Sequence, residues 1–79
     1  MNRVNLLSAL KSHNVNESLY SLDGFHKESE SYSIVEEGQQ FSVYYKERGE
    51  TTELANNLTE EEACDFLYTE FKSMFNWLK

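Results

Sequence analysis

The segment that begins at Thr59 constrains the fold most, because it predicts a long helix with an unusually broad apolar side. Thr59 and Glu62 have the spacing of a capping box, and Leu58 and Ala63 have that of a hydrophobic staple. At about 100° per residue, its apolar side chains span an arc of about 200°, roughly twice what packing on a single sheet requires. The arc contains Ala63, Cys64, Phe66, Leu67, Tyr68, Phe71, Met74, Phe75, Trp77 and Leu78. We expect the surplus surface to meet another helix of the chain; a partner interface is the alternative.

A helix that could cover this surplus is predicted at the start of the chain, over residues 2–12. Val4, Leu7 and Leu10 recur every three residues, and Leu6 lies beside them, so one face of the segment is apolar. Two asparagines at positions 14 and 16 then break the pattern.

The middle of the chain has the pattern of short strands separated by turns. Strands are predicted over residues 19–22, 32–35, 41–46 and 50–54, with a polar loop over residues 26–31. The turn signals are Asp23-Gly24, Glu37-Gly38-Gln39 and Arg48-Gly49. Three tight turns in succession favour an antiparallel meander. The predicted fold is therefore α+β: a short N-terminal helix, a three- to four-stranded antiparallel β-meander, and a long C-terminal helix packed on one face of the sheet.

The length and cysteine content limit the type of protein. With 79 residues the chain should form a single domain, residues 1–79, which has little spare volume for a deep catalytic pocket. Cys64 is the only cysteine, which excludes an intramolecular disulfide and fits a reducing compartment. The N-terminus lacks the apolar run of a signal peptide, and no stretch approaches the roughly 20 apolar residues that cross a bilayer. We expect a cytoplasmic protein that does not bind membranes.

The charge of the chain is strongly negative. Fourteen Asp and Glu residues outnumber seven Lys and Arg residues, which gives a net charge of −7. Such a field repels phosphate backbones and attracts basic surfaces. This argues against direct nucleic-acid binding, although acidity by itself also serves solubility.

Patterns typical of catalytic or metal sites are absent from the sequence. His13, His26 and Cys64 are too scattered for a zinc site, and no calcium loop, phosphate-binding loop or nucleophile elbow is present. The glutamates at 36–37 and 60–62 fall at a turn and a helix start, where water keeps them ionised. Cys64 lies in the apolar arc beside glutamates that disfavour a thiolate, so we interpret it as a core residue. We expect no enzymatic activity, no cofactor and no metal.

Three segments together resemble a known family. Residues 20–24 (Tyr-Ser-Leu-Asp-Gly), 43–49 (Val-Tyr-Tyr-Lys-Glu-Arg-Gly) and 60–64 (Glu-Glu-Glu-Ala-Cys) occur in that order. They resemble the small immunity proteins of bacterial polymorphic-toxin and contact-dependent growth inhibition systems. The resemblance covers most of the chain after about Leu19. A tryptophan often precedes the Val-Tyr-Tyr strand in that family, whereas this chain has Phe41, which keeps an aromatic side chain there.

The resemblance implies a protein that binds and neutralises the toxin made beside it, by occluding the toxin's active site or its substrate path. The toxins are commonly nucleases with basic active faces, which an acidic protein can approach quickly through electrostatic steering. The candidate toxin-binding residues are acidic residues expected on turns and sheet edges, with one tyrosine as an aromatic anchor. They are Asp23, Glu36, Glu37, Tyr44, Glu47, Glu50 and Glu53.

Other functions stay open at this point. The main alternative is a different acidic protein-binding inhibitor, or a nucleic-acid mimic such as a phage-derived anti-defence protein. A small enzyme is less favoured, because no activated group is visible. The sequence leaves open the toxin's identity and chemistry, the mode of blocking, and whether the free protein is a monomer or a homodimer.

Overall fold

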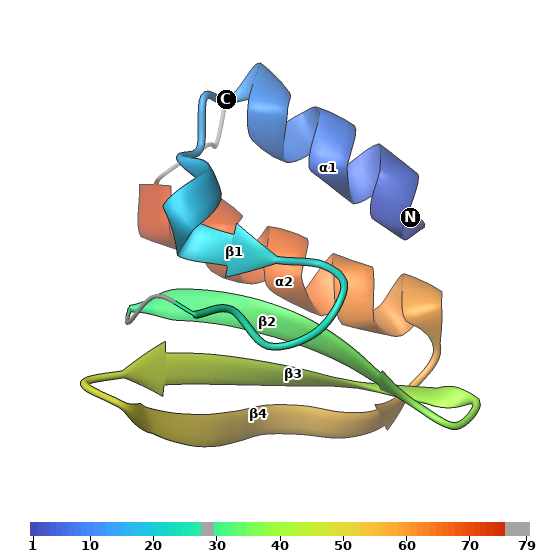
Figure 1. Ribbon diagram of the computed structural model, residues 1–79. Helices are drawn as coiled ribbons and strands as arrows, with labels where there is room; N and C mark the ends of the chain where they lie inside the picture. Colours follow the sequence, from blue (N-terminus) through green and yellow to red (C-terminus); the bar gives the residue numbers. More distant parts are fainter. Residues whose placement is uncertain (28–29, 76–79) are drawn as a thin grey trace.

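The computed structural model describes residues 1–27 and 30–75, and its elements follow the predicted order. Figure 1 shows helices α1 and α2 side by side, and strands β2 to β4 side by side in the sheet. The elements are α1 (Arg3–Ser12), the 3-10 helix η1 (Glu17–Leu19), β1 (Tyr20–Ser21), β2 (Ser31–Glu37), β3 (Gln40–Glu47), β4 (Glu50–Leu58) and α2 (Glu60–Phe75). The predicted α+β class is confirmed. Trp77 and Leu78, predicted on the apolar arc, lie outside the described residues.

The sheet has the order β1-β2-β3-β4, and its last three strands form the predicted antiparallel meander. Arg48 and Gly49 connect β3 to β4 with positive φ angles of 54° and 83°, as a two-residue type I′ hairpin requires. β4 is longer than predicted and continues to Leu58, because register shifts opposite Val43 let it bend and remain paired with β3.

Strand β1 differs from the prediction, because it pairs with β2 in parallel, Tyr20 opposite Tyr32. The Asp23-Gly24 signal was expected to reverse the chain into a hairpin. Instead the Gly24 N–H donates to the carbonyl of Ile34 at 3.0 Å, so the chain after the turn lies against β2 without pairing back on β1. The tight-turn interpretation of this segment was therefore wrong, while the two later turns are confirmed.

Helix α2 has neighbours on two sides, which explains its broad apolar arc. It contacts β2, β3 and β4, and it also contacts α1. Cys64, Leu67 and Phe71 are fully buried in one cluster with Leu6 and Leu10 of α1 and with residues of the sheet. The expectation that the surplus surface meets the first helix is confirmed. Met74 and Phe75, at the end of α2, are 49% and 42% exposed.

The buried face of α1 is different from the predicted one. Leu6 and Leu10, four residues apart, are fully buried, whereas Val4 is 75% exposed and Leu7 36% exposed. Residues at i and i+4 share one face of a helix, and this face is the one that packs on α2. The three-residue spacing of Val4, Leu7 and Leu10 therefore predicted burial of the wrong face of α1, one that neighbours the buried face.

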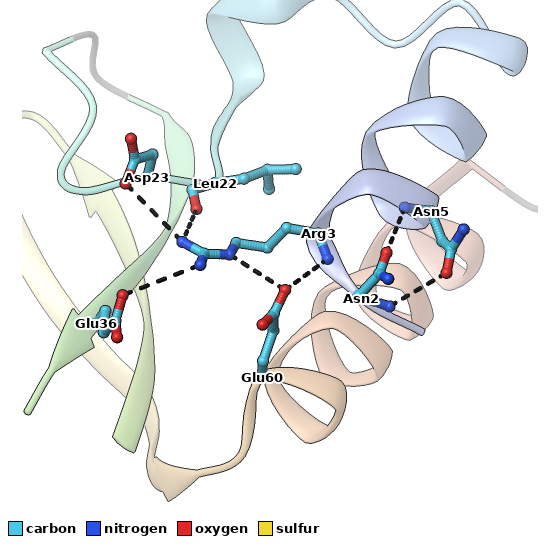
Figure 2. A network of polar contacts seen from close by, with 7 residues as sticks. All are labelled: Asn2, Arg3, Asn5, Leu22, Asp23, Glu36 and Glu60. Carbon is cyan, nitrogen blue, oxygen red and sulfur yellow. Dashed lines mark hydrogen bonds and ion pairs between the residues drawn. The ribbon is translucent and has the colours of Figure 1, made fainter. Parts of the chain in front are cut away.

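Both helices begin with reciprocal side-chain caps. The Thr59 N–H donates to Glu62 Oε1 at 2.9 Å, and the Glu62 N–H donates to Thr59 Oγ1 at 3.1 Å, so the predicted capping box is confirmed. Asn2 and Asn5 form the equivalent box at the start of α1 (Figure 2). In the described part of the chain, neither helix combines the length and apolar character needed to cross a membrane.

Candidate functional site

The seven predicted contact residues fall into three separate places on the fold. Asp23 and Glu36 lie around Arg3. Glu47 and Glu50 face each other across the β3–β4 turn. Glu37, Tyr44 and Glu53 lie together on the side of the sheet that faces away from α2, because alternate residues of a strand point to opposite faces. Glu36 and Glu37, adjacent in sequence, are separated by the same alternation.

Arg3 organises the first group, and Figure 2 shows its contacts. Its backbone N–H and its guanidinium Nε donate to Glu60 Oε2 at 2.9 and 3.3 Å. Its Nη1 donates to the carbonyl oxygen of Leu22 at 3.4 Å and lies 3.8 Å from Asp23 Oδ1, while Nη2 lies 3.9 Å from Glu36 Oε1. The guanidinium thus joins α1, the loop after β1, β2 and α2. A cation of the same chain, Arg3, already faces Asp23 and Glu36. We therefore interpret these two carboxylates as structural contacts that help to hold the fold together.

The third group forms an acidic–aromatic surface, which we define as Phe25, Glu37, Tyr44 and Glu53. The Tyr44 hydroxyl donates to Glu37 Oε2 at 3.3 Å, and the Tyr44 ring lies against the Phe25 ring with 4.9 Å between centroids. Glu53 sits opposite Tyr44 in the β3–β4 register. Burial raises the pKa of Tyr44, and the charges of Glu37 and Glu53 raise it further. Two carboxylates thus flank a pair of aromatic rings.

Phe25 was missed by the sequence interpretation, and this residue is 57% exposed. The loop that carries it is held on the sheet by main-chain contacts: the His26 N–H donates to Ser33 Oγ at 3.0 Å, and Lys46 Nζ donates to the Lys27 carbonyl at 3.1 Å. Ser33 and Ser42 on this face are almost fully buried. The one signal in the sequence was a single large apolar residue directly after the Asp23-Gly24 turn and before a polar stretch.

Glu53 is positioned by a neighbour on its own strand. Asn56 Nδ2 donates to Glu53 Oε1 at 3.1 Å, across the irregular part of β4. Glu53 is exposed. This contact orients a carboxylate without neutralising it, since an amide carries no charge.

Cys64, the one thiol of the chain, lies in the buried core. Burial, and secondarily the charge of Glu60, raises the pKa of Cys64 to about 11, so the thiol is neutral and enclosed in the core. Within residues 1–27 and 30–75, no three His, Cys, Asp or Glu side chains are arranged to hold a metal ion.

Comparisons of the chain with protein-family models, curated proteins and solved structures found no match. The resemblance to immunity proteins is therefore carried by the three segments described above.

Proposed function

We propose that this protein is an inhibitor of the immunity type, which binds a toxin with a basic active face and blocks its active site or substrate path. The observation that carries the proposal is the acidic–aromatic surface, where Glu37 and Glu53 flank the rings of Tyr44 and Phe25. The proposal also rests on the segment resemblance and on the net charge of −7.

The parts of this surface have complementary roles in the proposed complex. Tyrosine is enriched among the residues that dominate binding energy, because it supplies a large rigid apolar area together with a hydroxyl. Phe25 would be the second anchor, since it is exposed and its ring already contacts the ring of Tyr44. The carboxylates would steer a basic partner and set its orientation, an effect that acts mainly on the association rate.

The proposed partner is a nuclease domain that reaches its substrate in the cytoplasm. A nuclease needs a positively charged face to hold phosphates, and an acidic protein is attracted to the same face. The inhibitor itself would need neither catalysis nor a cofactor. Occupation of the partner's substrate path is sufficient to neutralise it.

Growth rescue tests this proposal directly. The domain encoded by the neighbouring gene would be expressed in bacteria as the candidate toxin. It would be combined with the wild-type chain, with Glu37→Lys, with Phe25→Ala, or with Glu17→Lys as a control of equal charge change on η1. We expect wild type and Glu17→Lys to restore growth. With purified proteins, Glu37→Lys should slow association about tenfold at low salt. Phe25→Ala should weaken binding about fivefold or more, mainly through faster dissociation.

Two results would contradict the proposal. If the wild-type chain fails to rescue growth against the adjacent toxin domain, the immunity role is wrong. If Glu37→Lys and Phe25→Ala bind and rescue as well as Glu17→Lys does, the toxin is bound elsewhere and the acidic–aromatic surface is not the site.

A further inference from the structure

Strand β4 forms one border of the sheet, and among the described residues 1–27 and 30–75 it is the longer of the two border strands. The sheet order places β4 at one border and the two-residue strand β1 at the other. In the described part of the chain, no strand pairs with the outer edge of β4, which is the outermost strand in Figure 1. Its outward N–H and C=O groups can therefore pair with another extended chain.

The hairpin geometry identifies the outward-pointing groups. In a two-residue hairpin the residues that flank the turn, here Glu47 and Glu50, form a hydrogen-bonded pair. Hydrogen-bonded and non-hydrogen-bonded pairs alternate along an antiparallel ladder. Thr52 thus points its N–H and C=O toward β3, while Thr51 and Glu53 point theirs outward. The register is regular from Glu50 to Glu53 and becomes irregular only beyond it.

The two glutamates of this stretch oppose pairing with a strand of like charge, but features that would block pairing with any strand are missing from residues 50–54. Residues 50–54 (Glu-Thr-Thr-Glu-Leu) contain no proline and no lysine, and all five are exposed. The register shifts occur after Glu53, so they do not interrupt the regular part of the edge. Thr51 and Thr52 are β-branched and favour an extended conformation. The edge is therefore suited to accept a strand.

The charges on β4 distinguish between a second copy of the chain and a different partner. Glu53 lies on the same face as Tyr44, and Glu50 lies on the opposite face with Glu47. Pairing of two copies would bring together chains that each carry a net charge of −7, with glutamates along both strands. Like charges across a sheet destabilise it, whereas opposite charges contribute favourably. Basic residues three positions apart on an added strand would meet Glu50 and Glu53.

We propose that the β4 edge pairs with an extended segment of the partner protein that carries two basic residues three positions apart. This inference rests on the proposed function, because it specifies how the basic partner is held. The added strand would continue the acidic–aromatic surface, since Glu53 belongs to both. Main-chain hydrogen bonds would come from Thr51 and Glu53, and the glutamates would select the basic sequence.

The test uses the full chain and a synthetic peptide. The probe is a blocked peptide of threonine and valine with two lysines three positions apart, and its twin has glutamates in their place. During titration of the ¹⁵N-labelled protein, the amide signals of Thr51 and Glu53 should shift most. The lysine peptide should bind about tenfold more tightly than its twin at low salt, and Glu50→Lys/Glu53→Lys should reverse that preference.

A matched pair of variants isolates the main-chain contribution. Thr51→Pro removes an outward N–H and leaves the ladder to β3 in place, whereas Thr51→Val keeps that N–H and a β-branched side chain. We expect Thr51→Pro to weaken peptide binding about fivefold or more and Thr51→Val to bind like wild type. Well-dispersed spectra of both variants would show that the fold is retained. If Thr51→Pro does not fold, the two charge-reversal arms decide the question by themselves.

Three results would overturn the inference. Equal binding of the two peptides, or the largest shifts lying outside β4, would exclude a charge-selected strand at this edge. Dimerisation of the protein alone that is lost on Thr51→Pro and kept on Thr51→Val would assign the edge to a second copy. Because Glu37→Lys leaves β4 untouched, it should impair growth rescue without changing peptide binding. If the peptide test fails while Glu37→Lys still impairs growth rescue, only the strand addition is rejected. If the lysine peptide binds as expected but the wild-type chain does not rescue growth, the inhibitor function is rejected.

Discussion

The backbone N–H of Arg3 and its guanidinium Nε donate to the same carboxylate oxygen of Glu60, at 2.9 and 3.3 Å. These residues open α1 and α2, and they are 57 positions apart in the sequence. The guanidinium carbon also lies 5.1 Å from the centre of the Phe41 ring. The contact therefore fixes the starts of both helices against each other and against the sheet.

This contact predicts a loss of stability in acid. The hydrogen bond from the Arg3 backbone is the largest cause of a lowered Glu60 pKa, relative to an ordinary value of 4.5. A carboxyl group with a lower pKa in the folded state adds stability above pH 4.5, and that stability is lost as the pH falls through the folded-state pKa. Urea titrations from pH 7 downward should show a smaller decrease in the free energy of unfolding for Glu60→Gln than for wild type. Glu61→Gln, at the adjacent exposed position, should retain the wild-type decrease.

The packing of α1 on α2 predicts a strong contrast between its two faces. Leu10→Ala removes a fully buried side chain and should lower the free energy of unfolding by about 2–5 kcal/mol. Val4→Ala, on a side chain that is 75% exposed, should change it by less than about 0.5 kcal/mol. Urea denaturation followed by far-ultraviolet circular dichroism measures both. Similar losses for the two variants would show that α1 packs on another face.

The β3–β4 turn predicts one stabilising and one destabilising substitution. Arg48 has a φ angle of 54°, which is unfavourable for most side chains but tolerated by asparagine. Arg48→Asn should therefore raise the melting temperature, with a gain of about 0.5 kcal/mol. Gly49→Ala, at a φ angle of 83°, should cost about 1–2 kcal/mol. A thermal melt in which both variants match wild type would mean that this turn contributes little.

Enclosure of Cys64 predicts slow thiol chemistry. Burial raises the pKa of this thiol from an ordinary value of 9.0 to about 11, and the side chain is fully buried. Iodoacetamide at pH 8 should react only as fast as the protein unfolds, and urea should accelerate the reaction. Because the folded-state pKa is the higher one, the associated stabilisation is complete below pH 9 and decreases from about pH 9 to 11. Rapid alkylation of the native protein at pH 8 would contradict this burial.

Removal of the Tyr20 hydroxyl should stabilise the protein. This oxygen is buried and makes no hydrogen bond with any described residue. A buried polar group without a partner costs free energy, so Tyr20→Phe should raise the free energy of unfolding by about 1 kcal/mol. Tyr44→Phe, whose hydroxyl bonds to Glu37 on the surface, serves as the control and should change it by less than about 0.5 kcal/mol. A clear loss of stability in Tyr20→Phe would show that the hydroxyl has a partner in solution.

Part of the candidate site was predictable from local patterns. The two-residue alternation of Phe41, Val43 and Tyr45 placed Tyr44 on the opposite side of the sheet, and the structure confirms that separation. Glu37 and Glu53 were predicted as contact residues, and the strand register brings both to Tyr44. Phe25 was not predicted, because its position depends on contacts between a loop and strands distant in sequence.

By itself, the sequence determined the helices, the antiparallel hairpins and the α2 capping box, because each depends on residues within a few positions of one another. The tertiary structure alone decided the parallel direction of β1, the buried face of α1 and the clustering of Asp23, Glu36 and Glu60 around Arg3. Each of these depends on atoms that meet only after the chain has folded. Local propensity contains no information about such encounters, so they follow from packing and from long-range hydrogen bonds.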